Sequence, residues 1–82
     1  MTSDHFQRPA KLPIQIIGPT TLKKARDAYR ARWGRSWPES DAYLAILIIE
    51  AKEIEGIAPS SKAKPDKIRE ITLELMRADH EF

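Results

Sequence analysis

Cysteine is absent from this sequence of 82 residues, and histidine occurs only twice. Without thiols the chain forms no disulfide and no thiolate metal site. His5 and His80 stand near opposite ends and share no ligand spacing, so we expect neither a metal nor a cofactor. A chain this short buries only about 60–65% of its unfolded surface and is marginally stable. With disulfides and metals excluded, oligomerisation is the remaining aid to stability.

Long apolar stretches are also missing. No segment reaches the ~20 consecutive apolar residues that a membrane-spanning helix needs. The first eleven residues, MTSDHFQRPAK, lack the apolar core of a signal peptide. We therefore expect a cytoplasmic protein without a membrane partner. Glycine-rich phosphate loops and Ser–His–Asp constellations are absent as well, so we expect no enzymatic activity.

Charged residues are abundant and unevenly distributed, although the net charge is only +2. Residues 1–36 hold eight basic and two acidic groups, a net +6, whereas residues 37–82 hold six basic and ten acidic groups, a net −4. A basic N-terminal half attracts polyanions, so this distribution predicts an anionic partner. The competing interpretation is an ordinary solvated charged surface.

The N-terminal part of the chain predicts an arm followed by a strand. Residues 1–10 are polar and without periodicity, which is typical of a flexible arm. In KLPIQII, residues 11–17, alternate apolar side chains share one face, which predicts a short strand. The missing N–H of Pro13 restricts this strand to a sheet edge. Because the sequence offers no convincing second strand, we expect the strand to pair with its copy in another chain.

Two helices are expected next, separated by a tight turn. The first covers about residues 22–33, and Gly34 ends it in the left-handed conformation. Ser36 and Glu39 have the spacing of a capping box, which opens a second helix that continues to about residue 55.

The second helix contains eight consecutive apolar residues, 42–49, so it is apolar on all sides. Such a helix is either the buried centre of an all-helical monomer or the shared core of an interlocked dimer. Residues 57–65 then read as a linker. Residues 66–82 read as a C-terminal amphipathic helix that runs to about residue 79, with an apolar stripe of Ile68, Ile71, Leu75 and Met76.

The order and spacing of these elements resemble the ribbon-helix-helix family of DNA-binding proteins over residues 11–56. The matching positions are Ile14, Ile16, Gly18, Pro19 and Leu22, with Gly34 to Ser36 following twenty residues after Ile14. The resemblance implies a mainly α fold in which one N-terminal strand pairs across an intertwined dimer, with two core helices and a C-terminal helix. The implied dimer core is Ile14, Ile16, Leu44, Ile46, Leu47, Ile48 and Ile49.

The resemblance also implies double-stranded DNA as a partner, read through the major groove by the two-stranded ribbon. The corresponding DNA-contacting positions are Lys11, Pro13, Gln15, Ile17, Lys23, Lys24, Arg35, Ser36 and Trp37. Of the outward ribbon residues, Gln15 alone can hydrogen-bond a base edge, so binding is expected to depend mainly on charge. The implied function is a homodimeric transcriptional repressor or an antitoxin-type regulator.

Two questions remain open at this point. The C-terminal helix either packs on the core or docks into a protein partner such as a toxin, as an amphipathic helix can. The alternative function is a small protein-interaction module or inhibitor that binds a protein through its helices, without DNA binding.

Overall fold

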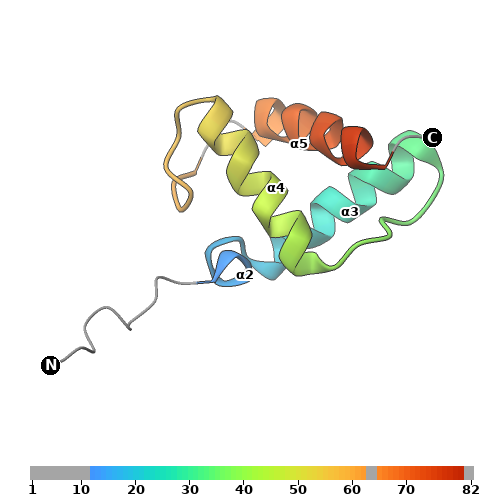
Figure 1. Cartoon of the computed structure of the whole chain (residues 1–82), viewed down its shortest axis with the longest axis horizontal. Helices are drawn as coiled ribbons and strands as arrows, with labels where there is room; N and C mark the ends of the chain where they lie inside the picture. Colours follow the sequence, from blue (N-terminus) through green and yellow to red (C-terminus); the bar gives the residue numbers. More distant parts are fainter. Residues whose placement is uncertain (1–11, 63–64, 81–82) are drawn as a thin grey trace, which may run out of the picture.

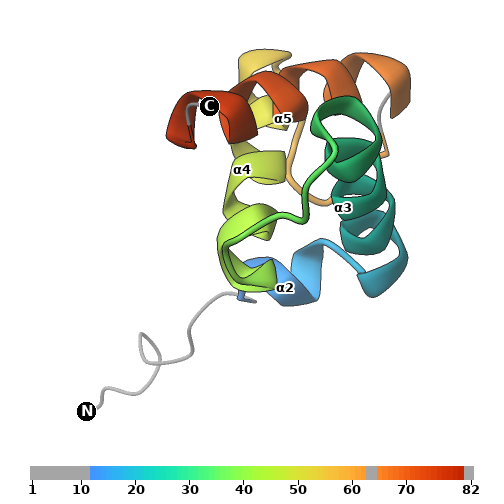
Figure 2. The ribbon, with the colours of Figure 1, turned by 90° about the vertical axis from the view of Figure 1, so that its right-hand side faces the viewer.

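The computed structural model describes residues 12–62 and 65–80, which form the helices α2 (Pro13–Ile16), α3 (Pro19–Trp33), α4 (Asp41–Ile54) and α5 (Pro65–Asp79). Helix α5 packs against both α3 and α4 at one end of the molecule, and α2 lies at the other end against α4 (Figure 2). The expectation of a mainly α fold is confirmed for this part of the chain. None of its helices combines the length and apolar character needed to cross a bilayer.

The prediction of a strand at residues 11–17 is wrong, because the described part of this segment forms the single-turn helix α2. Pro13 takes the first helical position, where its missing N–H costs nothing. The Leu12 N–H donates to the Gln15 side chain over 2.8 Å, and the Ile17 N–H donates to the Pro13 carbonyl over 2.9 Å. These local bonds satisfy backbone groups that a strand could satisfy only with a partner.

The prediction of a ribbon-helix-helix architecture is wrong as well, since no β-strand occurs within residues 12–62 and 65–80. The alternation that predicted a strand spans only three apolar residues, too few to distinguish a strand from one helical turn. Helix α2 instead packs against α4 of its own chain (Figure 1), so no second copy is needed to complete the backbone hydrogen bonds. Lys11 and the expected arm, residues 1–10, lie outside the described residues.

The turn between the two central helices is longer than expected. Helix α3 ends at Gly34, whose φ of 72° is the left-handed conformation that the sequence predicts. Helix α4, however, begins after Ser40, whose hydroxyl accepts a hydrogen bond from the Tyr43 N–H over 3.2 Å. The prediction that Ser36 and Glu39 form a capping box is therefore wrong. Ser40 caps the helix, and Ser36 and Glu39 lie in the loop before it.

The hydrophobic core lies between α3, α4 and α5 and is closed at one end by the residue that follows α2. Its buried members are Ile17, Leu22, Tyr29, Trp37, Leu44, Ala45, Leu47, Ile48, Ala51, Ile68, Leu73 and Met76. Helix α4 is thus surrounded by elements of its own chain over part of its circumference. This arrangement corresponds to the all-helical monomer that the sequence left open.

The residues expected in the dimer core therefore divide into two groups. Leu44, Leu47 and Ile48 are buried inside the single chain, so they are not available to a second copy. Ile14 and Ile46 are exposed, and Ile16 and Ile49 are half-buried. The division follows the helical period, since α2, α3 and α5 cover one side of α4 and leave the other side to solvent.

The C-terminal helix packs on the core. Helix α5 contacts both α3 and α4, and its Ile68 and Met76 are buried. Ile71 and Leu75 are half-buried against the same core. The preceding segment is also attached, because the Lys52 ammonium group on α4 donates to two backbone carbonyls of the loop 57–62.

Candidate functional site

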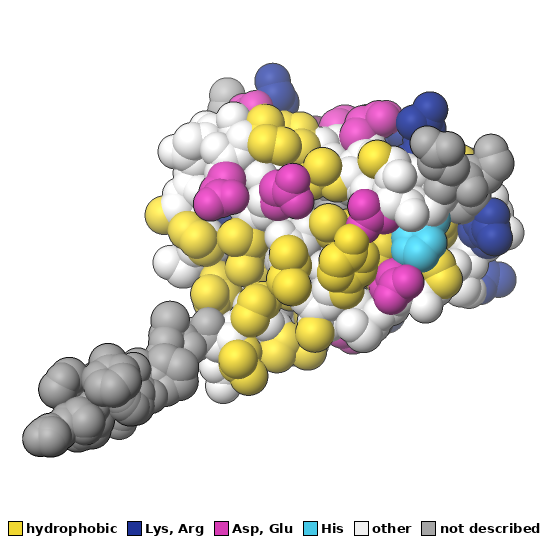
Figure 3. All heavy atoms as spheres, in the orientation of Figure 1, with side chains coloured by type: hydrophobic (Ala, Val, Ile, Leu, Met, Phe, Trp, Pro, Cys, Tyr) yellow, Lys and Arg dark blue, Asp and Glu magenta, His cyan; other side chains and the backbone are white. Residues whose placement is uncertain are grey.

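An apolar face covers α2 and the solvent side of α4. Four large hydrophobic side chains are exposed there: Leu12, Ile14, Ile46 and Ile54 are 59%, 41%, 46% and 58% exposed. In Figure 3 hydrophobic side chains run together across this side of the molecule. A contiguous exposed apolar patch on a small protein commonly marks an interaction site. We call these four residues, with the half-buried Ile49, the apolar face.

The apolar face was only partly expected from the sequence. Ile14, Ile46 and Ile49 are among the predicted dimer-core residues, whereas Leu12 and Ile54 are not. Ile54 follows Ile46 by eight residues, a spacing that brings a residue back to nearly the same side of a helix. That spacing is the signal that could have found it.

The charged side chains that accompany the apolar face are acidic. Glu50 and Glu53 are exposed on α4 between Ile46 and Ile54. Figure 3 shows Asp and Glu side chains among the hydrophobic ones, while Lys and Arg side chains lie at the edges of this view. The apolar face is therefore an unsuitable surface for a polyanion such as DNA.

Basic side chains of α3 are paired with acidic residues from the C-terminal half of the chain. A nitrogen of Arg26 lies 2.6 Å from the Asp41 carboxylate at the start of α4. A nitrogen of Arg32 lies 3.1 Å from the Glu70 carboxylate on α5. The basic N-terminal part of the chain, residues 1–36, thus forms ion pairs with the acidic part, residues 37–82, within one molecule. Part of the positive charge predicted for an external partner is therefore paired within the chain, between α3 and the helices α4 and α5.

The remaining cations of α3 lie closer to solvent. Lys23 pairs with Asp27 one turn later, with 2.8 Å between the charged atoms. The hydrogen bond from Lys23 holds the pKa of the Asp27 carboxyl below its ordinary value. Arg30 donates to the Ser36 hydroxyl over 3.3 Å. Lys24 forms no ion pair with another described residue, so its charge is available to a ligand.

The residues predicted to contact DNA are distributed over several elements. Gln15, Lys23, Lys24, Arg35 and Ser36 are exposed, Pro13 is half-buried, and Ile17 and Trp37 are buried. Ile17 and Trp37 therefore offer almost no surface to a nucleic acid. The ribbon that would present Pro13, Gln15 and Ile17 to a major groove is absent from the described chain.

Trp37 belongs to a cluster of aromatic rings that closes the loop between α3 and α4. Its ring centroid lies 5.3 Å from that of Tyr29 and 5.0 Å from that of His80, both in edge-to-face geometry. Tyr43 stacks on the same indole, and its hydroxyl donates to the Asp79 carboxylate. Burial raises the pKa of Tyr29 above its ordinary value. These contacts assign Trp37 to packing, where aromatic pairs add about 0.5–1.5 kcal/mol beyond area burial.

Comparison with known proteins adds no family to this picture: no family model, no curated protein and no solved structure matches the chain. The resemblance to ribbon-helix-helix proteins therefore rests on sequence spacing alone. The surfaces that the fold exposes are the features that can indicate its function. The apolar face and the cations outside it are the two candidates.

Proposed function

We propose that this chain is a small helical interaction module, not an enzyme, and that it forms a homodimer through the apolar face. The observation that carries the proposal is the exposure of four large hydrophobic side chains on one side of α2 and α4. Removing such a side chain from water contributes roughly 1.5–3 kcal/mol when its burial is complete. An 82-residue chain without disulfides gains stability from covering this surface.

A second copy of the chain fits this surface because a twofold contact places the same patch on both partners. In an antiparallel crossing of α4 on its copy, Ile46 and Ile49 lie near the twofold axis. Glu53 then approaches the first turn of the opposite α4. The positive end of the helix dipole favours a carboxylate at that point, and the Asp41 carboxylate of the same turn is already paired with Arg26.

Light scattering tests this proposal directly. The wild-type chain, of 9.4 kDa, is expected to show twice that mass at micromolar concentration. Ile46→Asp is expected to return the mass to that of one chain, because the dimer would bury an unpaired carboxylate at its centre. The circular dichroism of this variant should stay helical, since Ile46 is 46% exposed in the single chain.

Ala31→Asp is the matched control, because it introduces the same charge at an exposed position of α3. This variant is expected to keep the wild-type mass. A wild-type chain that remains monomeric over the whole micromolar range would contradict the homodimer.

Nucleic-acid binding that depends mainly on electrostatic contacts is a second candidate function. Its support is a set of exposed cations on one side of α3, where Lys23 and Arg30 are seven residues apart and Lys24 is adjacent. This side carries no member of the apolar face, so one molecule has room for both contacts. Without a described ribbon, the contacts available are to phosphates and not to base edges.

Titration with duplex DNA at several salt concentrations tests this second candidate. Replacing Lys23 and Lys24 together by alanine is expected to weaken binding to all sequences alike and to flatten the salt dependence by about 0.9 log units per lost phosphate contact. Lys67→Ala, at an exposed position on α5, is the control and should change neither quantity. Absence of binding at low salt would remove this candidate.

A further inference from the structure

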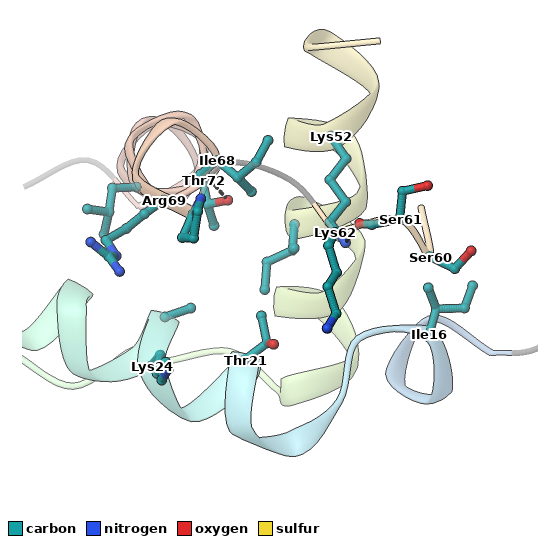
Figure 4. Close-up of a pocket in the computed structure, with 14 residues that line it drawn as sticks. Ile16, Thr21, Lys24, Lys52, Ser60, Ser61, Lys62, Ile68, Arg69 and Thr72 are labelled. Atoms are coloured by element: carbon teal, nitrogen blue, oxygen red, sulfur yellow. Dashed lines mark hydrogen bonds between the residues drawn. The ribbon is translucent and has the colours of Figure 1, made fainter. Parts of the chain in front are cut away.

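A groove with a cavity of about 450 Å³ opens between α3, α4, α5 and the loop 57–62 (Figure 4). Ile48 and Lys52, which line it, are two and six residues beyond Ile46 and lie on a different side of α4 from the apolar face. The groove is therefore a separate feature. Its volume falls within the range of about 300–1,000 Å³ that is usual for small-molecule sites. We call it the basic groove.

The basic groove has positive charge from four directions. Its cationic side chains are Lys24 of α3, Lys52 of α4, Lys62 of the loop and Arg69 of α5. The chain has twelve acidic residues, yet no described carboxylate lines the groove. Four cations around one concave, partly apolar surface focus a positive potential inside it.

Most of this charge is not neutralised by any carboxylate within residues 12–62 and 65–80. The Lys52 ammonium group donates to the Pro59 and Ser61 carbonyls, over 2.9 and 3.0 Å, so it faces neutral acceptors. These two bonds also hold the loop in place as a wall of the groove. Neither Lys24 nor Lys62 forms an ion pair with another described residue. Figure 4 shows the Lys62 side chain extending from the loop toward α3, on which Lys24 lies.

The fourth cation is paired only at the rim. Arg69 lies 3.2 Å from the Asp66 carboxylate, whose side chain is 95% exposed. An exposed pair of this kind contributes little and yields readily to a second anion. The Arg69 guanidinium group thus remains available to a ligand in the groove.

Hydroxyl groups and an apolar floor complete the basic groove. Thr21, Ser60 and Ser61 supply hydroxyl groups to its lining, whereas the Thr72 hydroxyl already donates to the Ile68 carbonyl over 2.7 Å. Between the cations the lining is apolar, with Ala25, Ile48, Ile68 and Leu73 in or against the hydrophobic core. The groove therefore offers cations and hydroxyl donors at its edge and hydrocarbon at its base.

We propose that the basic groove binds a small organic phosphate. The phosphate group pairs with Lys24, Lys62 and Arg69, and the apolar body of the ligand lies on Ile48 and Leu73. A phosphate presents several acceptor oxygens and close to two negative charges, which suits lysine and arginine donors arriving from different directions. The apolar body is either a ring, as in a nucleoside monophosphate, or a short alkyl chain.

Titrations monitored by backbone amide NMR test the proposal with AMP, hexyl phosphate, adenosine and inorganic phosphate as probes. AMP or hexyl phosphate is expected to bind saturably and to shift amides of Thr21, Lys24, Ser61, Lys62 and Arg69. The more tightly bound of the two shows whether the body is a ring or a chain. Adenosine and inorganic phosphate are each expected to bind at least about tenfold more weakly, because each lacks half of the ligand.

The neighbouring residues Lys23 and Lys24 provide matched variants. Lys24→Ala and Lys62→Ala are each expected to raise the Kd for the preferred phosphate about threefold to tenfold. Lys23→Ala should leave the Kd unchanged, because Lys23 pairs with Asp27 and does not line the groove. All three side chains are exposed, so the variants are expected to fold.

Three results would overturn the proposal. The first is no saturable binding of either organic phosphate at millimolar concentration. The second is equal binding of adenosine and AMP, which would leave the cations without a role. The third is an equal effect of Lys23→Ala and Lys24→Ala together with displacement of AMP by duplex DNA, which would make the groove part of a general nucleic-acid surface.

Discussion

Replacement of Leu44 by aspartate is expected to leave the chain without cooperative helical structure. Leu44 is completely buried in the first turn of α4 and belongs to the hydrophobic core. Loss of a buried leucine side chain alone costs about 2–5 kcal/mol. A carboxylate in the same apolar position adds a desolvation penalty of several kcal/mol. The sum exceeds the roughly 3–5 kcal/mol that a core of this size supplies.

Circular dichroism at 222 nm and thermal unfolding measure this effect. Ile46→Asp is the control, because it makes the same chemical change two residues further along the same helix at a position 46% exposed. Leu44→Asp should show little helical signal and no unfolding transition, whereas Ile46→Asp should unfold cooperatively. A folded Leu44→Asp variant would contradict the core described here. An unfolded Ile46→Asp variant would mean that the single chain cannot fold without its copy.

Removal of every residue after Gly56 is expected to have a comparable effect. The deletion takes away α5, whose Ile68, Leu73 and Met76 are all buried. It also uncovers the surfaces of α3 and α4 on which α5 packs. The truncated chain should therefore lose its cooperative thermal transition, as circular dichroism would show. If α5 served only an external partner, the truncated chain would keep the wild-type melting temperature.

Point variants in α5 test the same contact without removing the helix. Met76→Ala is expected to lower the free energy of unfolding by about 2–5 kcal/mol, because Met76 is fully buried. Leu75→Ala, at a half-buried position, should cost less than Met76→Ala. Glu74→Ala, at an exposed position of the same turn, should change the stability by less than about 0.5 kcal/mol. Chemical denaturation of the three variants provides the comparison, and an equal effect of all three would exclude the packing described for α5.

Local signals in the sequence were sufficient for several elements. Helix α3 ends at Trp33 with Gly34 in the left-handed conformation, as expected from the glycine. Helix α5 covers Pro65–Asp79, close to the expected residues 66 to about 79. These elements are predictable because end signals and a 3.6-residue period act over a few neighbouring residues.

Choices between alternatives of similar local energy were decided only by the tertiary structure. Residues 11–17 alternate over too short a distance to distinguish a strand from a turn of helix, and the packing of α2 on α4 decided for the helix. Likewise, Ser36 and Ser40 both offer a helix cap. In the folded chain Trp37 is buried within a loop that extends to Ser40, and α4 begins only after Ser40.

The surfaces that carry the proposals depended most on tertiary structure. Eight consecutive apolar residues cannot show which of them face the core, because that depends on where α2, α3 and α5 pack around α4. The charge asymmetry of the sequence likewise could not show that Arg26 and Arg32 pair with acidic residues of α4 and α5. The sequence by itself determined α5, the C-terminal end of α3 and the small size of the chain. Contacts between residues distant in the chain determined which apolar and basic side chains remain for a partner, since burial and charge pairing are properties of the folded chain.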